Sequence, residues 1–219
     1  MNKIDAMHNI KRAVIQKISA ILGTGLVVLI LAAAGPDGAR AAGAQEPVER
    51  LNAVLIETMM NADRLGYRGR FDLLSPVLVE VFNFPRMAQS TVRGEWQDAD
   101  EAQRRAMVEA FTRLSIAEFA SRFDGFSGER FEVGDLVEGR RGLVLVQNTL
   151  FKSDGEGIAI NYVVGQFADQ WRILDIRLGA AISELAVKRS EYTSVLRSTD
   201  LNGLVNLIEQ KIDTLEQES

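Results

Sequence analysis

The chain contains no cysteine, and its 219 residues include one histidine, His8. These shortages argue against most kinds of active site, because serine and cysteine nucleophiles are activated by histidine, and zinc and haem sites use histidine or cysteine ligands. Without cysteine there is also no disulfide. A secreted domain with this composition must therefore be held together by its hydrophobic core alone.

Residues 1–44 have the three parts of a secretory signal peptide. A charge-free apolar run, 18–34, is followed by the small-residue segment 35–44. The basic region before the run consists of Lys3, Lys11, Arg12 and Lys17. We expect cleavage after Ala41 or Ala44, which leaves a mature domain of residues 45–219. The alternative is an uncleaved anchor helix, but the apolar run is short for a bilayer and is interrupted by Gly23, Thr24 and Gly25.

The signal peptide and the charge of the mature domain indicate the compartment and exclude some partners. There is no cysteine at the cleavage site and no twin arginine before the apolar run, so we expect the Sec route into a bacterial periplasm. The leader holds five of the 25 basic and two of the 30 acidic residues, which leaves 20 minus 28, a net charge of −8. Such a surface repels nucleic acid and anionic headgroups. Any membrane role must work through apolar contact or a partner.

Apolar residues recur at helical spacing in the first part of the mature domain. They predict a first helix over residues 48–65, with Gly66 as its natural stop. Between residues 67 and 93 the pattern breaks into shorter pieces. Ser75 with Pro76 predicts one helix start there, and Pro85 predicts another.

Three further helices are predicted. Asp98 is expected to cap a long helix that reaches Gly125, with Glu101 completing an acidic capping box. Helical spacing returns after the strands described next. It predicts one helix over residues 181–197 and a final one, capped by Thr199 or Asp200, through Leu215.

From residue 129 the apolar period changes from helical spacing to alternation. Glycine-rich turns divide this stretch into four consecutive strands, predicted at Glu129–Glu138, Gly142–Lys152, Gly157–Phe167 and Gln170–Leu178. Consecutive strands with short turns form an antiparallel meander. The predicted fold is therefore one α+β domain, with helices packed on a four-stranded antiparallel meander sheet.

Both faces of this predicted sheet carry apolar side chains. In the third strand, Tyr162 and Val164 alternate with Val163 and Phe167. A half-exposed meander would have one polar face, so the sheet is either covered by helices on both sides or curls around something. The pattern leaves two interpretations open, a dry core between helical layers and a hydrophobic cavity.

The remaining polar motifs give little support to catalysis or metal binding. Candidate carboxylate pairs lie at helix starts and strand ends, where solvated charge is ordinary. The loop 153–157 offers too few oxygen ligands for an EF-hand, and no glycine-rich phosphate loop lies between a strand and a helix. We expect no catalytic residue, no metal and no cofactor.

Several segments together resemble a known family. Residues 83–96, 98–123, 170–178 and 188–197 are similar to the toluene-tolerance or MlaC family of periplasmic lipid-binding proteins. Residues 65–72, 122–133 and 183–197 are most similar to its HpnM members, which are associated with hopanoid biosynthesis. The resemblance extends over about residues 48–215. One departure is Phe84, Pro85, Arg86 and Met87, where relatives carry a different aromatic-arginine pattern.

The resemblance implies a carrier without catalytic activity. Such a protein holds a hopanoid or phospholipid in an apolar pocket between sheet and helices, and exchanges it with transport complexes of the inner and outer membranes. An acyl chain of about 16 methylenes costs roughly 13 kcal/mol to expose to water, so free diffusion of a lipid is too rare to serve transport. The expected lipid-binding residues are Leu55, Met59, Phe111, Leu114, Phe119, Val144, Val146, Ile160, Tyr162, Val164, Leu174, Ile176, Ile182, Leu185 and Tyr192.

Two alternatives belong to other classes of protein. One is a small periplasmic α+β enzyme that acts on a terpenoid-like lipid, with a buried carboxylate such as Asp175 and the phenol of Tyr162 transferring protons. The other is a protein-interaction subunit with a solid core. An enclosed cavity would favour the carrier over the interaction subunit.

Overall fold

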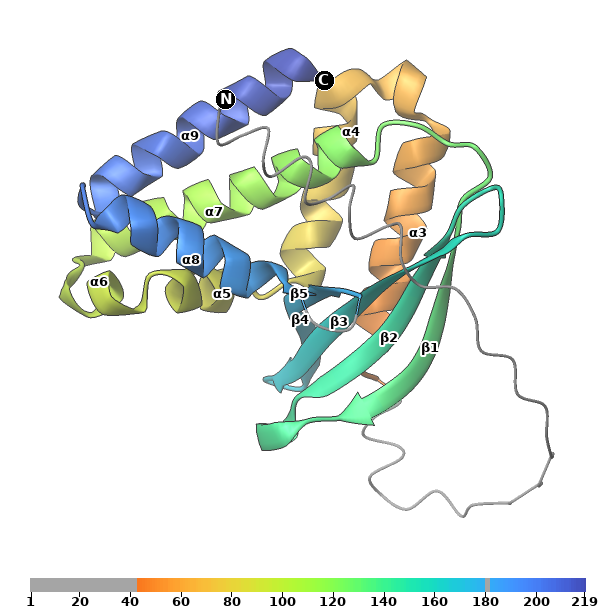
Figure 1. The fold of residues 1–219 in the computed structure, drawn as a ribbon, viewed down its shortest axis with the longest axis horizontal. Coiled ribbons are helices and arrows are strands. Elements are labelled where there is room, and N and C mark those ends of the chain that lie inside the picture. The colour runs from red at the N-terminus through yellow and green to blue at the C-terminus, as the bar shows by residue number, and fades with distance from the viewer. Residues whose placement is uncertain (1–42, 180–181) are drawn as a thin grey trace. The chain divides into compact units, whose positions relative to one another are not determined.

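The computed structural model describes residues 43–179 and 182–219, and over these residues the chain folds as helices and one antiparallel sheet (Figure 1). The predicted signal peptide, at residues 1–44, lies almost wholly outside the described residues. Among the described helices, none is both long and apolar enough to cross a membrane. The helices are α3 (Glu46–Met60), α4 (Ala62–Val81), α5 (Phe84–Thr91), α6 (Arg93–Asp98), α7 (Glu101–Arg122), α8 (Glu184–Leu196) and α9 (Leu201–Glu218).

The sheet has five strands in the order β1-β2-β3-β4-β5, all antiparallel to their neighbours. The prediction of four strands was therefore wrong by one. The extra strand, β5, has two residues, too few for alternation to be visible in the sequence, and it lies in the segment assigned to a helix. The other strands are β1 (Arg130–Glu138), β2 (Val144–Phe151), β3 (Gly157–Phe167) and β4 (Gln170–Leu178).

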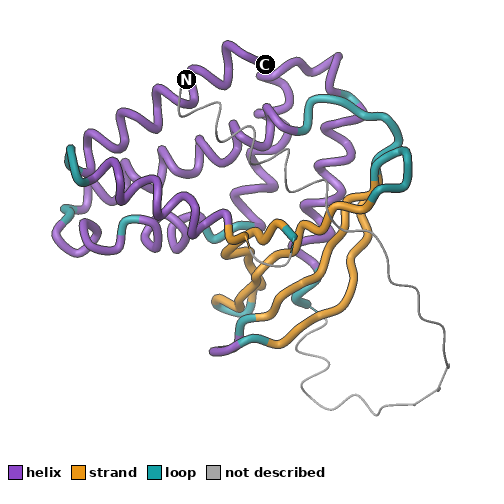
Figure 2. The backbone as a smooth tube through the Cα atoms, in the orientation of Figure 1, coloured by secondary structure: helices purple, strands orange, loops and turns teal. Residues whose placement is uncertain are grey.

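The helices gather on one side of the strands (Figure 2). Side chains on the face toward the helices are fully buried, among them Val146, Tyr162 and Ile173, each at most 1% exposed. On the other face, Leu145 and Val163 face each other across β2 and β3 and are only half-buried. One face of the sheet therefore carries the core, and the second apolar face is only partly covered.

The first helical region differs from its prediction. The first helix ends at Met60, and Asn61 separates it from α4, which is interrupted at Gly66 but continues through Pro76. Gly66 interrupts the helix, as expected of a stop: its φ of 58° and ψ of −178° are not helical, so two helical segments meet there at a kink within α4. Pro76 lies inside α4, not at its start. Leu74 and Leu78, both 0% exposed, are buried on either side of Pro76, which explains why the helix continues through the proline.

The capping box of α7 lies two residues later than predicted. The side chain of Asp100 accepts a hydrogen bond from the Gln103 backbone N–H (2.8 Å), and the Gln103 side chain accepts one from the Asp100 N–H (3.0 Å). Asp98 ends the short helix α6 instead. The sequence offers an acidic residue at both positions, each followed after three residues by Glu or Gln, so the pattern fits either register. Asp200 caps α9, as expected.

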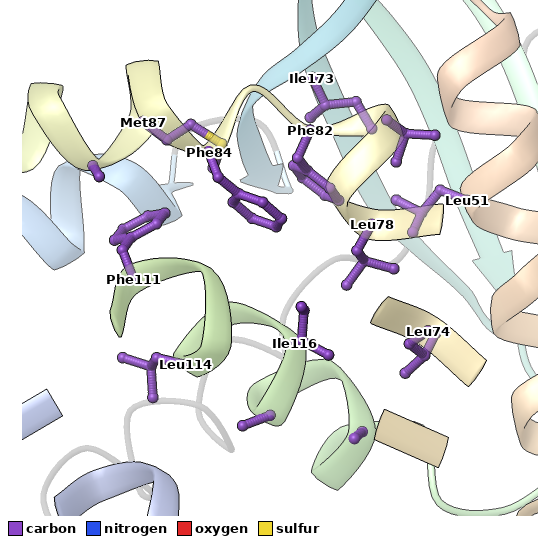
Figure 3. Close-up of a cluster of buried hydrophobic side chains, with 14 of the residues drawn as sticks. Leu51, Leu74, Leu78, Phe82, Phe84, Met87, Phe111, Leu114, Ile116 and Ile173 are labelled. Carbon is purple, nitrogen blue, oxygen red and sulfur yellow. The ribbon is translucent and has the colours of Figure 1, made fainter. Parts of the chain in front are cut away.

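Large apolar side chains from helices and sheet meet in one core (Figure 3). The rings of Phe82 and Phe84 are stacked with centroids 5.2 Å apart, and Phe82 also packs 5.9 Å from Phe119. Phe82 forms a parallel bridge with Ile173, and the next N–H, of Asn83, donates to the Ile173 carbonyl at 2.9 Å. This short link between α4 and α5 therefore joins the helical layer to β4.

Two leucine substitutions test this distribution of packing. Leu78→Ala removes a fully buried side chain and leaves a cavity, so we expect a loss of about 2–5 kcal/mol in the free energy of unfolding. Leu207→Ala alters a side chain that is 47% exposed, so the free energy of unfolding should change by no more than about 0.5 kcal/mol. Urea unfolding followed by circular dichroism measures both. Similar losses in the two variants would contradict the assigned core.

Candidate functional site

The structure places most of the predicted lipid-binding residues in the packed core. Phe119, Ile160, Ile176 and Leu185 are half-buried members of its edge, and Ile182 is 40% exposed. The fully buried ones are Leu55, Met59, Phe111, Leu114, Val144, Val146, Tyr162, Val164 and Tyr192. The sequence pattern thus identified residues that meet in the hydrophobic core.

Two features of the predicted pocket differ from expectation. Half-buried Leu174 lies beside Gly165, so it is on the face opposite Val164. The expected enclosed cavity is not shown either, because the buried residues of the set pack together in the core. Two hollows on the described part of the protein are lined by residues of the helices and not of the sheet.

An open groove of about 380 Å³ lies between α4, α7 and α9. Its lining residues are Tyr67, Arg68, Phe71, Ser75, Val79, Thr112, Arg113, Ile116, Ile212 and Glu216. Tyr67, Ile116 and Ile212 also belong to the buried core, so the floor of the groove is the surface of that core. None of the lining residues was predicted, and the groove is the candidate site that sequence reasoning missed.

The groove follows from a regular stripe on α4. Tyr67, Phe71, Ser75 and Val79 recur every fourth residue and therefore lie on one helix face. This four-residue spacing is present in the sequence, but it cannot be seen when a new helix is assumed to start at Pro76. Thr112 and Ile116 on α7, and Ile212 and Glu216 on α9, repeat the same four-residue spacing. Three helix faces thus supply the walls.

Polar groups of both signs surround the hydroxyl of Tyr67. The side chain is buried, and its hydroxyl has no hydrogen-bond partner among the described residues. Burial raises the pKa of this phenol, and the charge of Glu216 adds to the effect, whereas Arg68, Arg113 and Arg70 oppose it. Tyr67 is therefore a neutral hydrogen-bond donor at neutral pH, near three guanidinium groups and one carboxylate.

An ion cluster joins α7 and α9, two of the three helices of the groove, to α8. Glu118 of α7 accepts hydrogen bonds from Lys188 Nζ of α8 (2.8 Å) and Lys211 Nζ of α9 (3.0 Å). Burial raises the pKa of Glu118, but the charges and hydrogen bonds of the two lysines outweigh it and lower the pKa from 4.5 to about 2. The carboxylate therefore joins three helices as long as it is ionised. Arg113 and Glu209 form a second, more exposed link between α7 and α9.

The enzyme alternative gains no support from the described geometry. In the register of β3 and β4, Tyr162 is opposite Ile176 and Val163 is opposite Asp175. Tyr162 and Asp175 consequently point to opposite faces of the sheet. Asp175 instead accepts a hydrogen bond from the backbone N–H of Leu185 (3.1 Å). Among the residues that the structure describes, no group of three or more His, Cys, Asp or Glu side chains is arranged to hold a metal ion.

Substitution of Glu118 tests the ion cluster. At pH 7, Glu118→Gln should lower the free energy of unfolding by on the order of 2 kcal/mol, because two lysines lose the charge of a half-buried carboxylate. The stabilisation of the native protein is complete above pH 4.5 and is lost as the pH falls towards 2. The two proteins should therefore converge in acid. Denaturant unfolding between pH 7 and pH 2 measures the difference.

The matched control for Glu118→Gln is Glu132→Gln. Glu132 pairs with Arg130 on β1, and its side chain is 63% exposed. We expect a change of about 0.5 kcal/mol or less there, because exposed ion pairs are screened by solvent. A Glu118→Gln deficit that stays constant with pH would contradict the role given to this carboxylate.

Comparisons with known proteins agree with one another. A family model described as MlaC protein matches residues 50–210. A solved structure is also similar, that of the phospholipid-binding protein from Ralstonia solanacearum in complex with a phospholipid. The TM-score is 0.69 at 20% identity, over 78% of this chain and 98% of that one, a similarity of fold. No curated protein matches the sequence.

Proposed function

Because the chain belongs to the MlaC protein family, we propose that it is a periplasmic lipid carrier that holds the apolar part of a lipid against its hydrophobic core. The observation that carries this proposal is the groove between α4, α7 and α9, whose floor is the core itself. Its volume of about 380 Å³ lies within the range of about 300–1,000 Å³ that small-molecule pockets occupy. It is at the lower end of that range, so it accommodates part of a lipid.

A longer lipid chain would continue from the groove into the core. Ile116 and Ile212 line the groove and are 3% and 4% exposed, so they separate it from the residues beneath. When these side chains move apart, a chain would next meet buried residues of the predicted pocket, such as Phe111 and Leu114. In this proposal, core side chains that contact one another in the lipid-free protein contact the lipid instead when it is bound. The cost of entry is then lost packing, offset by burial of the lipid's methylenes.

The cargo is a hopanoid or a phospholipid, and both have the large apolar body that this proposal requires. The similarity to HpnM members favours the first, and the Ralstonia protein was solved with the second. Transfer between the inner and outer membranes would depend on protein partners in each. The net charge of −8 expected for residues 45–219 opposes direct docking on anionic headgroups, which makes partner proteins the more favourable route.

Lipid analysis of the native protein tests the proposal. The protein, purified in its mature form from its native host and extracted with organic solvent, should release about one lipid molecule per chain. Mass spectrometry identifies that lipid and separates hopanoid from phospholipid. A protein that carries no lipid, and takes up none from vesicles containing both classes, would show that it is not a carrier.

A bulky side chain in the groove tests where the lipid enters. Ser75→Trp places an indole between Phe71 and Val79 on the stripe of α4, so lipid uptake should fall at least tenfold while the protein stays folded. Ser194→Trp, at an exposed position on α8, is the matched control and should leave uptake unchanged. Transfer of a fluorescent lipid from vesicles measures both. Equal uptake by the two variants would place the lipid elsewhere.

A further inference from the structure

The groove contains a hydrogen-bond donor that the folded chain does not use. Tyr67 is 9% exposed and lines the groove, and its hydroxyl has no partner among the described residues. Three residues further along α4, Arg70 is 4% exposed and donates its Nε–H to the Ala120 carbonyl (2.8 Å). Its Nη2 has no partner there either. Buried polar groups are ordinarily hydrogen-bonded, and Arg70 does not line the groove, so the Tyr67 hydroxyl is the unpaired donor of the lining that can take an acceptor from a ligand.

Basic residues outnumber acidic ones in the lining around this unpaired hydroxyl. Arg68 and Arg113 line the groove together with one acidic residue, Glu216, so the formal net charge of the lining side chains is +1. Both arginines have carboxylate partners outside the groove, Asp72 and Glu209. These pairs are exposed and therefore worth little, so either guanidinium can turn to an anion at small cost. Ser75 and Thr112 are the other polar residues of the lining.

We propose that Tyr67 and Arg113 form a phosphate subsite, which binds the phosphate group of a lipid while its apolar chain lies along Phe71, Val79 and Ile116. The phenol donates one hydrogen bond to a phosphate oxygen, and the guanidinium pairs with the phosphate charge. Phosphate is the anion that fits best, because it offers several acceptor oxygens to donors on two helices at once. The subsite rests on the proposed carrier function and refines it.

The subsite would make the carrier select among lipids of equal apolar size. A neutral lipid leaves the Tyr67 hydroxyl without an acceptor and leaves Arg113 with its exposed partner only. A hydrogen bond between a neutral donor and a charged acceptor is typically strong enough to change affinity about tenfold or more. Lipids with a phosphate headgroup are therefore preferred over neutral lipids, whether these are diacylglycerols or hopanoid hydrocarbons.

Competition between two lipids with the same chains tests this inference. Lipid-free protein is incubated with vesicles that contain equal amounts of dioleoylphosphatidylethanolamine and dioleoylglycerol, then reisolated, and the bound lipids are counted by mass spectrometry. The native protein should favour the phospholipid about tenfold or more. Tyr67→Phe and Arg113→Gln should each abolish most of this preference without reducing total lipid uptake.

Two control variants separate the subsite from general effects on the fold. Tyr192→Phe removes another buried, unpartnered hydroxyl, one that lies on α8 outside the groove. Glu209→Gln breaks the same ion pair as Arg113→Gln but keeps the guanidinium. Both should retain the native preference. A preference that persists in Tyr67→Phe and Arg113→Gln, or that falls equally in the controls, would overturn the inference.

The remaining outcomes distinguish the subsite from the carrier function. Uptake of both lipids in equal amounts by the native protein would overturn the phosphate subsite and leave the carrier intact. Uptake of neither lipid would overturn both. Isothermal titration with inorganic phosphate completes the test. Binding of inorganic phosphate that is as tight as binding of the phospholipid, and is lost in Arg113→Gln, would show that the site serves free phosphate and not a lipid headgroup.

Discussion

The position of α4 on the sheet depends on a two-residue link to β4. Phe82 and Asn83 lie between the end of α4 and the start of α5, and both contact Ile173 of β4 through the backbone. The Phe82 ring then packs on Phe84 and Phe119, so the same residue fixes α4, α5 and α7 against the sheet. In a chain without cysteine, this buried aromatic contact takes the place that a covalent link has in many secreted proteins. This contact also sets the position of α4, and with it the helix face that lines the groove.

The sequence predicted the sheet better than the helices, for physical reasons. Strands β3 and β4 have the predicted bounds because alternation and short turns are local properties of the chain. The course of α4 is not local. Gly66 interrupts the helix, as its local preference predicts, but Pro76 does not, and the burial of Leu74 and Leu78 between other elements explains why the helix continues through Pro76. The start of α7 was ambiguous because the sequence offers two possible capping boxes, Asp98 with Glu101 and Asp100 with Gln103.

The candidate site shows a similar limit. Alternation and helical spacing identified residues that meet in the core, but such patterns record burial only and cannot tell a filled interior from a hollow one. The groove is formed by the faces of three helices, and which faces adjoin is decided by tertiary packing. Its unpaired polar atoms, such as the hydroxyl of Tyr67, become visible only when every neighbouring donor and acceptor is placed.

Gly66 places the stripe of α4 that the groove uses. Its φ of 58° with ψ near 180° belongs to a region of backbone space that is essentially reserved for glycine. No atom lies within 4 Å of the position that a Cβ would occupy there, so space does not restrict this position and backbone geometry alone does. Another residue would be strained in this conformation, and a helix without the kink would change the angle between residues 62–65 and the segment that carries Tyr67 and Phe71. This position therefore requires glycine for its backbone conformation and not for lack of space.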